Sequence, residues 1–102
     1  MEQDATSDES NFVTEFVDQY LDFNDPESKS KVNDVYKFLE EIARIRGFGT
    51  NKLPRLKRDL DRRLEEHDVQ RARMRFGKRR NGKPDISLGY RGVKILNGVE
   101  DE

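Results

Sequence analysis

The chain has 102 residues, 32% of them hydrophobic and 40% charged, with a formal net charge of -1, one His and no Cys. This composition excludes more than one domain, disulfides, thiolate zinc sites, Cys nucleophiles and a His-rich metal site. No apolar run reaches the roughly 18 residues of a transmembrane helix, and no apolar stretch follows the acidic start as in a signal peptide, so an intracellular protein is expected.

The acidic beginning of the chain predicts a tail and a first amphipathic helix. Residues 1–10 are polar and aperiodic, which predicts a disordered acidic tail. A helix follows, with Ser10 or Asn11 as its N-cap, and Asn24-Asp25-Pro26 ends it. Its single apolar stripe consists of Phe12, Val13, Phe16, Val17, Tyr20 and Leu21.

A second helix is predicted after Lys31-Val32, which is either a short strand or the lead-in to the helix. Asn33 is the expected N-cap, with Asp34 in the first turn, and Gly47 is a natural stop. The expected buried face consists of Val35, Tyr36, Leu39, Ile42 and Ala43.

A third helix begins the basic second half. Thr50 is its expected cap, Pro54 fits its first turn, and its end is expected to fray near His67-Asp68. The apolar face consists of Leu53, Leu56, Leu60 and Leu64.

A β-hairpin is predicted after this helix. Residues 69–76 and 86–95 have the composition of strands, and Asn81-Gly82 between them is typical of a hairpin turn. Gly89 and Gly92 in the second strand predict a bulge or a bend.

Three helices followed by a hairpin predict an α+β fold, the winged helix-turn-helix, over residues 11–96, with residues 97–102 as an acidic C-terminal tail. The turn at residues 46–49 fits the short Gly-containing joint of this motif. The third helix would then enter the major groove of DNA, and the hairpin would be the wing that contacts an adjacent groove or the phosphates.

Charge is divided along the chain. Residues 1–34 carry 10 acidic and 2 basic side chains, whereas residues 50–94 carry 15 basic and 6 acidic ones. The field of the second half is therefore positive, which favours a negatively charged partner. The candidate nucleic-acid-binding residues are Asn51, Lys52, Arg55, Lys57, Arg58 and Arg62 in the third helix, and Arg71, Arg73, Arg75, Lys78, Arg79, Arg80 and Lys83 in the hairpin.

The two groups of basic residues differ in how strongly they indicate binding. In the third helix, acidic side chains one turn away offer partners, so a solvated surface explains the pattern equally well. In the hairpin, Arg71, Arg73 and Arg75 alternate with apolar residues and would repel one another on one face of a strand. The expected partner strand, residues 86–95, holds no acid, so this row favours a function.

Three motifs together follow a known pattern. They are Phe12, Phe16, Val17 and Tyr20 in the first helix, Val35, Tyr36 and Phe38 in the second, and Arg79, Arg80, Asn81, Gly82 and Lys83 followed by Tyr90, Gly92, Val93 and Ile95 in the hairpin. This combination resembles the C-terminal winged-helix domain of the primase-helicases of phages, plasmids and large DNA viruses that have a superfamily 3 helicase core. The third helix departs from that pattern, because Leu53-Pro54 to Leu60 stands in place of a Phe-Gly pair and a basic-Leu step.

The resemblance implies an accessory domain of a larger replication protein, or a small replication protein, acting on a DNA duplex or fork in a prokaryotic host or a virus-infected cell. The sequence has no phosphate-binding loop of the Gly-x-x-x-x-Gly-Lys-[Ser/Thr] type, so these residues are not expected to hydrolyse ATP. No nucleophile-base pair or metal set is visible, so no enzyme activity and no cofactor are expected.

Three interpretations of the function remain open. In the first, the basic residues bind DNA phosphates, and Asn51, Lys52, Arg55 and Arg58 read bases. In the second, the chain is a protein-docking module or a transcriptional regulator with the same fold, and the acidic residues 1–10 meet a basic partner or fold back on the basic face. In the third it binds RNA, for which the electrostatics are the same.

Overall fold

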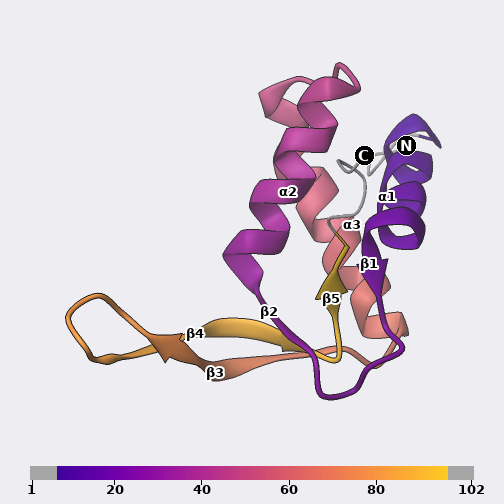
Figure 1. The fold of residues 1–102 in the computed structure, drawn as a ribbon. Helices are drawn as coiled ribbons and strands as arrows, with labels where there is room; N and C mark the ends of the chain where they lie inside the picture. Colours follow the sequence, from indigo (N-terminus) through magenta and orange to yellow (C-terminus); the bar gives the residue numbers. More distant parts are fainter. Residues whose placement is uncertain (1–6, 97–102) are drawn as a thin grey trace.

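The computed structural model describes residues 7–96, which form three helices standing on antiparallel strands (Figure 1). The helices are α1 (Ser7–Tyr20), α2 (Val32–Ile45) and α3 (Leu53–Glu66), and a 3-10 turn, η1 (Thr50–Lys52), leads into α3. The strands are β1 (Leu21–Asp22), β2 (Lys29–Lys31), β3 (Gln70–Lys78), β4 (Pro84–Arg91) and β5 (Lys94–Ile95). The expected α+β class is confirmed, and the arrangement is compatible with a winged helix. None of the helices in this part of the chain is long and apolar enough to cross a membrane.

The main sheet has the order β2-β4-β3 and is antiparallel throughout. β2 lies between α1 and α2 in the sequence but pairs with β4, so the acidic beginning of the chain is anchored to the basic hairpin. A second small sheet pairs β1 with β5 and ties the end of the described chain to the end of α1. The β3–β4 hairpin projects well beyond the helices (Figure 1).

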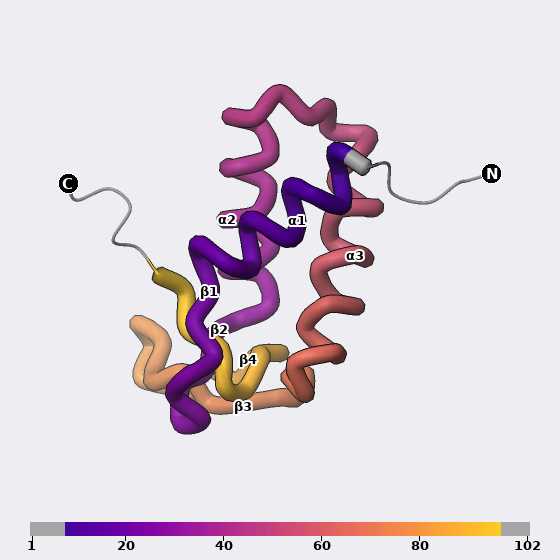
Figure 2. The backbone as a smooth tube through the Cα atoms, turned by 90° about the vertical axis from the view of Figure 1, so that its right-hand side faces the viewer, coloured from indigo at the N-terminus to yellow at the C-terminus, as the bar shows by residue number. Residues whose placement is uncertain are grey.

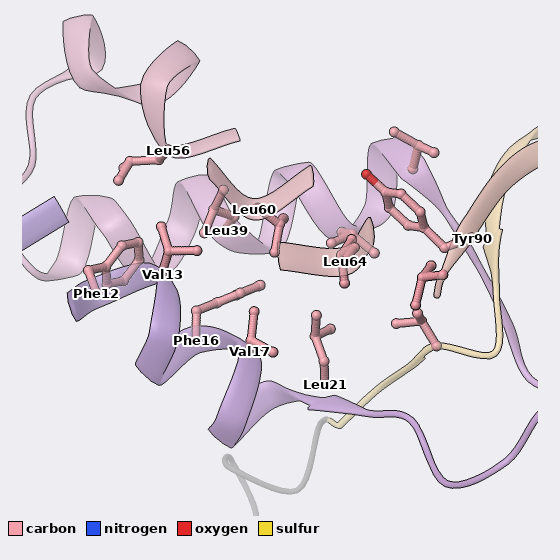
Figure 3. Packing of buried hydrophobic residues seen from close by; sticks show 14 of the residues in the cluster. Phe12, Val13, Phe16, Val17, Leu21, Leu39, Leu56, Leu60, Leu64 and Tyr90 are labelled. Carbon is pink, nitrogen blue, oxygen red and sulfur yellow. The ribbon is translucent and has the colours of Figure 1, made fainter. Parts of the chain in front are cut away.

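The core lies between the three helices and the base of the hairpin (Figure 3). Figure 2 shows α1 lying over α2 and α3, which stand side by side. The apolar stripes predicted from the sequence meet here: Phe16, Leu39 and Leu60 are all fully buried. Phe48, from the turn after α2, packs on Phe12 with ring centroids 5.1 Å apart. Burial of these stripes is the main force that holds the helices together.

Both α2 and α3 end in the same type of capped turn. After α2, Gly47 has φ +93°, its N–H donates to Arg44, and the N–H of Phe48 donates to Ala43, both at 3.0 Å. After α3, Asp68 takes the left-handed position with φ +63°, and the N–H groups of Asp68 and Val69 donate to Glu65 and Leu64. These are Schellman motifs, which satisfy the last helical carbonyls. The end of α3 is therefore a defined cap and not the expected fray.

The helix starts differ from the sequence prediction. α1 begins at Ser7, so the last four residues of the expected 1–10 tail belong to the helix, and residues 1–6 lie outside the described part. The reason is that Glu9 is buried against α3, which stabilises an additional helical turn. The N-cap position of α2 is Lys31 and not Asn33, because the chain enters the helix directly from β2.

The start of α3 and the second strand of the hairpin also differ. Thr50 does not cap α3, because residues 50–52 form the 3-10 turn η1. The expected strand 86–95 is two strands, β4 and β5, separated by a bend at Gly92, whose φ is +83°. Gly89 marks no bulge. It allows a close approach, since a Cβ there would lie 2.5 Å from the Phe76 ring and 2.9 Å from the Ser30 carbonyl oxygen. The irregularity in the ladder is in β3, between Arg75 and Lys78.

Replacing Asp68 by Gly should stabilise the fold. A non-Gly residue in the left-handed region costs about 1 kcal/mol, and the Asp68 side chain makes no hydrogen bond with residues 7–96 that would offset it. We expect the free energy of unfolding in urea to rise by about 0.5–1 kcal/mol. Gly47→Ala is the matched control at the other cap and should lower it by about 1 kcal/mol, because its Cβ meets open space and only the backbone is strained. A destabilised Asp68→Gly variant would contradict the assignment of this cap.

Candidate nucleic-acid interface

One face of α3 presents arginines to solvent. Arg55, Arg58 and Arg62 are exposed and lie at positions i, i+3 and i+7, on the side of the helix opposite its buried leucines. Asn51, in the preceding turn, is exposed as well. The helical spacing of the predicted site is therefore preserved as an exposed basic face.

The first turn of α1 engages part of that predicted set. Glu9 is only 1% exposed, and its carboxylate lies 3.1 Å from Lys52 Nζ and 4.0 Å from Arg55 Nη1. Arg63 donates from Nη2 to Ser10 Oγ at 2.7 Å. These contacts hold the first turn of α1 against η1 and α3, so Lys52 has a structural role that the sequence did not reveal.

Two further helical residues of the predicted site form ion pairs within the domain. Lys57 Nζ lies 2.5 Å from Glu40 Oε2 on α2. Arg62 Nη2 lies 2.5 Å from Oδ1 of the buried Asp59, which also pairs with Arg63. Of the predicted cations on α3, Arg58 alone has no ion pair with residues 7–96.

The arginine row of β3 faces the helices. Arg71, Arg73 and Arg75 lie directly opposite Tyr90, Leu88 and Ile86 of β4, and residues that pair across a ladder share a face. Tyr90 is buried under α3, so this is the face on which the helices stand. Only the base of the hairpin lies beneath the helices, and Arg73 and Arg75 are exposed farther along it. Arg71, Arg73 and Arg75 therefore share one face of the hairpin, as predicted, and this face begins beneath the helices.

At the base of the hairpin, Asp61 of α3 joins four structural elements. Its carboxylate accepts hydrogen bonds from the hydroxyls of Tyr36 on α2 and Tyr90 on β4, both at 2.6 Å. Arg71 of β3 donates to the same carboxylate and to the Tyr36 hydroxyl, both at 3.4 Å. Arg71 thus has an acidic neighbour. This neighbour lies on α3, so the acid-free partner strand did not indicate it.

The electrostatics of this Asp61 cluster follow from its burial. Burial, and then the hydrogen bond to Asp61, raise the pKa of both Tyr90 and Tyr36 above the ordinary tyrosine value. The negative charge of Asp61 raises the pKa of Arg71. The cluster therefore holds neutral phenols and a charged guanidinium around one carboxylate.

The end of the hairpin is the most strongly basic part of the structure. Lys78, Arg79, Arg80 and Lys83 are all exposed around the Asn81-Gly82 turn, where Lys83 N–H donates to Asn81 Oδ1 at 3.0 Å. Arg79 lies 3.6 Å from Asp85, the single acid on β4. The other three have no ion pair with the described residues.

Two lysines that the sequence did not assign to the site reach the opposite face of the hairpin. Lys29 and Lys31 of β2 lie over the Phe76 ring, 5.4 and 5.6 Å from its centroid. Lys31 also pairs with Asp85 at 2.5 Å, and the pKa of Asp85 is lowered chiefly by this hydrogen bond. Only the pairing of β2 with β4 brings these lysines to the hairpin, so no local signal could have identified them.

The predicted basic residues therefore divide into two sets. Those that carry ion pairs within the domain are Lys52, Arg55, Lys57, Arg62, Arg71 and Arg79. Those that are exposed cations with no ion pair to residues 7–96 are Arg58, Arg73, Arg75, Lys78, Arg80 and Lys83, which we call the exposed cations. Among the described residues, no group of three or more His, Asp or Glu could hold a metal ion. What the site offers is positive charge at the surface.

The Asp61 cluster predicts a loss of stability at alkaline pH. Tyr90 stays protonated in the folded chain at pH values where it ionises in the unfolded chain. The contribution of its hydroxyl to the free energy of unfolding is therefore complete below the unfolded pKa of about 10, and it is lost as the pH rises further. Above about pH 10, the free energy of unfolding in urea should fall less steeply with pH in Tyr90→Phe than in the wild type, by roughly 1 kcal/mol per pH unit. At pH 7 the same variant should be less stable by about 1–3 kcal/mol, because Asp61 loses a buried donor. Leu60→Val, which removes packing alone, should keep the wild-type slope, and equal slopes for all three chains would contradict the prediction.

Comparisons with known proteins add no relative to this description. No family model, no curated protein and no solved structure matches the chain.

Proposed function

We propose that this chain is a winged-helix domain that binds DNA through its exposed cations. The observation that carries the proposal is that these six basic side chains, on α3 and along the β3–β4 hairpin, are exposed and unpaired with residues 7–96. Like charges gathered on one surface without partners repel one another, and an extended polyanion relieves that repulsion. Phosphate contacts of this kind supply most of the affinity for nucleic acids.

The order of the elements supports the same proposal. A winged helix consists of a first helix, a short strand, two further helices and a hairpin. The second strand of the hairpin pairs with the short strand, as β4 pairs with β2 here. In this arrangement α3 enters the major groove and the hairpin lies along the backbone beside it. The Asp61 cluster connects α3 to β3 and β4, so the two binding elements are held as one rigid surface.

The proposal gives the exposed residues different roles. Arg73, Arg75 and the end of the hairpin contact phosphates, which position the protein without reading sequence. Asn51 and Arg58 are the candidates for base contacts, because Lys52 and Arg55 pair with Glu9. The resemblance to primase-helicase domains makes an origin duplex and a replication fork the targets to compare first.

The test is a salt titration of binding to duplex, forked and single-stranded DNA and to an RNA hairpin, with an Arg73→Ala/Arg75→Ala variant. With six phosphates neutralised, duplex affinity should fall about a thousandfold between roughly 50 and 200 mM salt. The variant should reduce the slope of log K against log salt by about 1.8, because each lost phosphate contact removes about 0.9. Both arginines are exposed and unpaired with the described residues, so the variant should fold normally.

An Arg44→Ala/Lys94→Ala variant is the matched control. It removes the same charge from exposed positions on α2 and β5, away from α3 and the hairpin, and should leave the slope unchanged. Equal losses in the two variants would mean that net charge alone attracts the DNA. No binding to any of the four probes at low salt would reject the nucleic-acid proposal, and tighter binding to the RNA hairpin would reassign it to RNA.

A further inference from the structure

The main sheet has an open edge beside the beginning of α2. β2 pairs with β4 only from Lys29–Arg91 to Lys31–Gly89, after which the chain leaves the sheet and enters α2. Residues 84–88 of β4 continue past that point toward the end of the hairpin. They pair with β3 on one side, and no strand among residues 7–96 pairs with them on the other. Five residues of β4 therefore have no strand beside them at the position that β2 vacates (Figure 1).

Two apolar side chains lie exposed along this open edge. Ile86 and Leu88 are each 52% exposed and lie on the face of β4 that the helices stand on. Leu88 also lines a hollow at the base of α2, together with Val32 and Lys37. The other edge of the sheet, along β3, offers nothing comparable, because its one large aliphatic side chain, Met74, is buried. An apolar pair two residues apart along an unpaired strand edge favours a strand-forming partner.

Positive charge surrounds the apolar pair. Arg73 and Arg75 lie directly across β4 from Leu88 and Ile86, Lys37 stands at the α2 end of the hollow, and Lys83 is at the hairpin end. None of these four has an ion pair within the segment that the structure describes. The hollow also contains Asp34, and Asp85 at the hairpin end pairs with Lys31 and Arg79. The balance around the pair is positive, which selects an acidic partner.

We propose that the open edge of β4 is a docking site for a short extended segment of a partner protein, acidic in character, with two apolar side chains at positions i and i+2. The segment adds a strand where β2 leaves the sheet, and its main chain pairs with residues 84–88. Its two apolar side chains cover Ile86 and Leu88, since alternate residues of a strand share a face. Its acidic residues meet Lys37 at one end and Lys83 at the other. The proposal does not depend on DNA binding.

The probe is a synthetic seven-residue peptide with two valines at i and i+2, one threonine between them and two acidic residues at each end. Titrated into the 15N-labelled chain without DNA, it should shift the amides of residues 85–88 and of Lys37 and slow hydrogen exchange along β4. A peptide of the same composition with adjacent valines places them on opposite faces and should bind about tenfold more weakly. A peptide N-methylated at alternate residues should also lose binding, because it cannot complete the ladder.

Variants of the chain complete the test. Ile86→Thr/Leu88→Thr keeps good strand formers at exposed positions and should weaken binding about tenfold. Gln70→Thr, exposed on β3 and on the opposite face, is the control and should change nothing. Equal affinity for all the peptides would show that charge attraction alone drives binding, and so would amide shifts confined to Arg73 and Arg75. Either result would overturn the proposal.

Two outcomes would assign the edge to another occupant and so also overturn the proposal. Concentration-dependent dimerisation in sedimentation that Ile86→Thr/Leu88→Thr abolishes would show that a second copy of the chain occupies the edge. Tighter peptide binding by a chain truncated after Leu96 would show that residues 97–102, which contain Val99 and three acids, already occupy it.

Discussion

One carboxylate determines how the helices are set against the hairpin. Asp61 on α3 accepts a hydrogen bond from Tyr36 on α2 and another from Tyr90 on β4, and it pairs with Arg71 on β3. Dispersion and hydrophobic contacts bring these elements together but are not directional. Hydrogen bonds to a charged acceptor are directional, and in a half-buried site they cost much when one partner is missing. The direction in which the hairpin leaves the helical layer, and hence the position of Arg73 and Arg75, depends on this cluster.

The fold uses about half of its predicted binding cations for its own stability, and the acids that engage them come from α1, α2, α3 and β4. Glu9 and Asp59 are buried carboxylates whose partners are basic residues of η1 and α3. A buried carboxylate requires such partners, because an unpaired charge in a desolvated site is strongly destabilising. The charge asymmetry along the sequence is therefore partly neutralised in three dimensions. The cations that remain exposed lie on α3 and the hairpin, away from the acidic α1.

Local patterns predicted the helices and the hairpin, but the proposed binding surface depends on contacts between distant residues. The leucine spacing of α3 and the alternation of β3 identified their faces because burial imposes those periods. The alternation could not show that the arginine face is the one beneath the helices, since it separates a basic face from an apolar face without indicating which of them the helices cover. Glu9 was missed because it lies in an acidic, aperiodic stretch, and its partner Lys52 is distant in the sequence. Lys29 and Lys31 were missed because only the β2–β4 pairing places them.

The proposed DNA surface and the proposed peptide edge meet at Arg73 and Arg75. The two arginines lie on one face with Ile86 and Leu88, so phosphates and an acidic strand approach them from the same side of the hairpin. Both proposals also use Lys83, and two negatively charged ligands cannot both engage it fully. Linkage makes the effect reciprocal: whatever binding free energy the peptide loses in the presence of DNA, DNA loses in the presence of the peptide. An acidic partner at the edge of β4 would therefore displace the hairpin from DNA while leaving Arg58 on α3 available. If both proposals hold, partner binding would release one of the two proposed nucleic-acid contacts without any change in the fold.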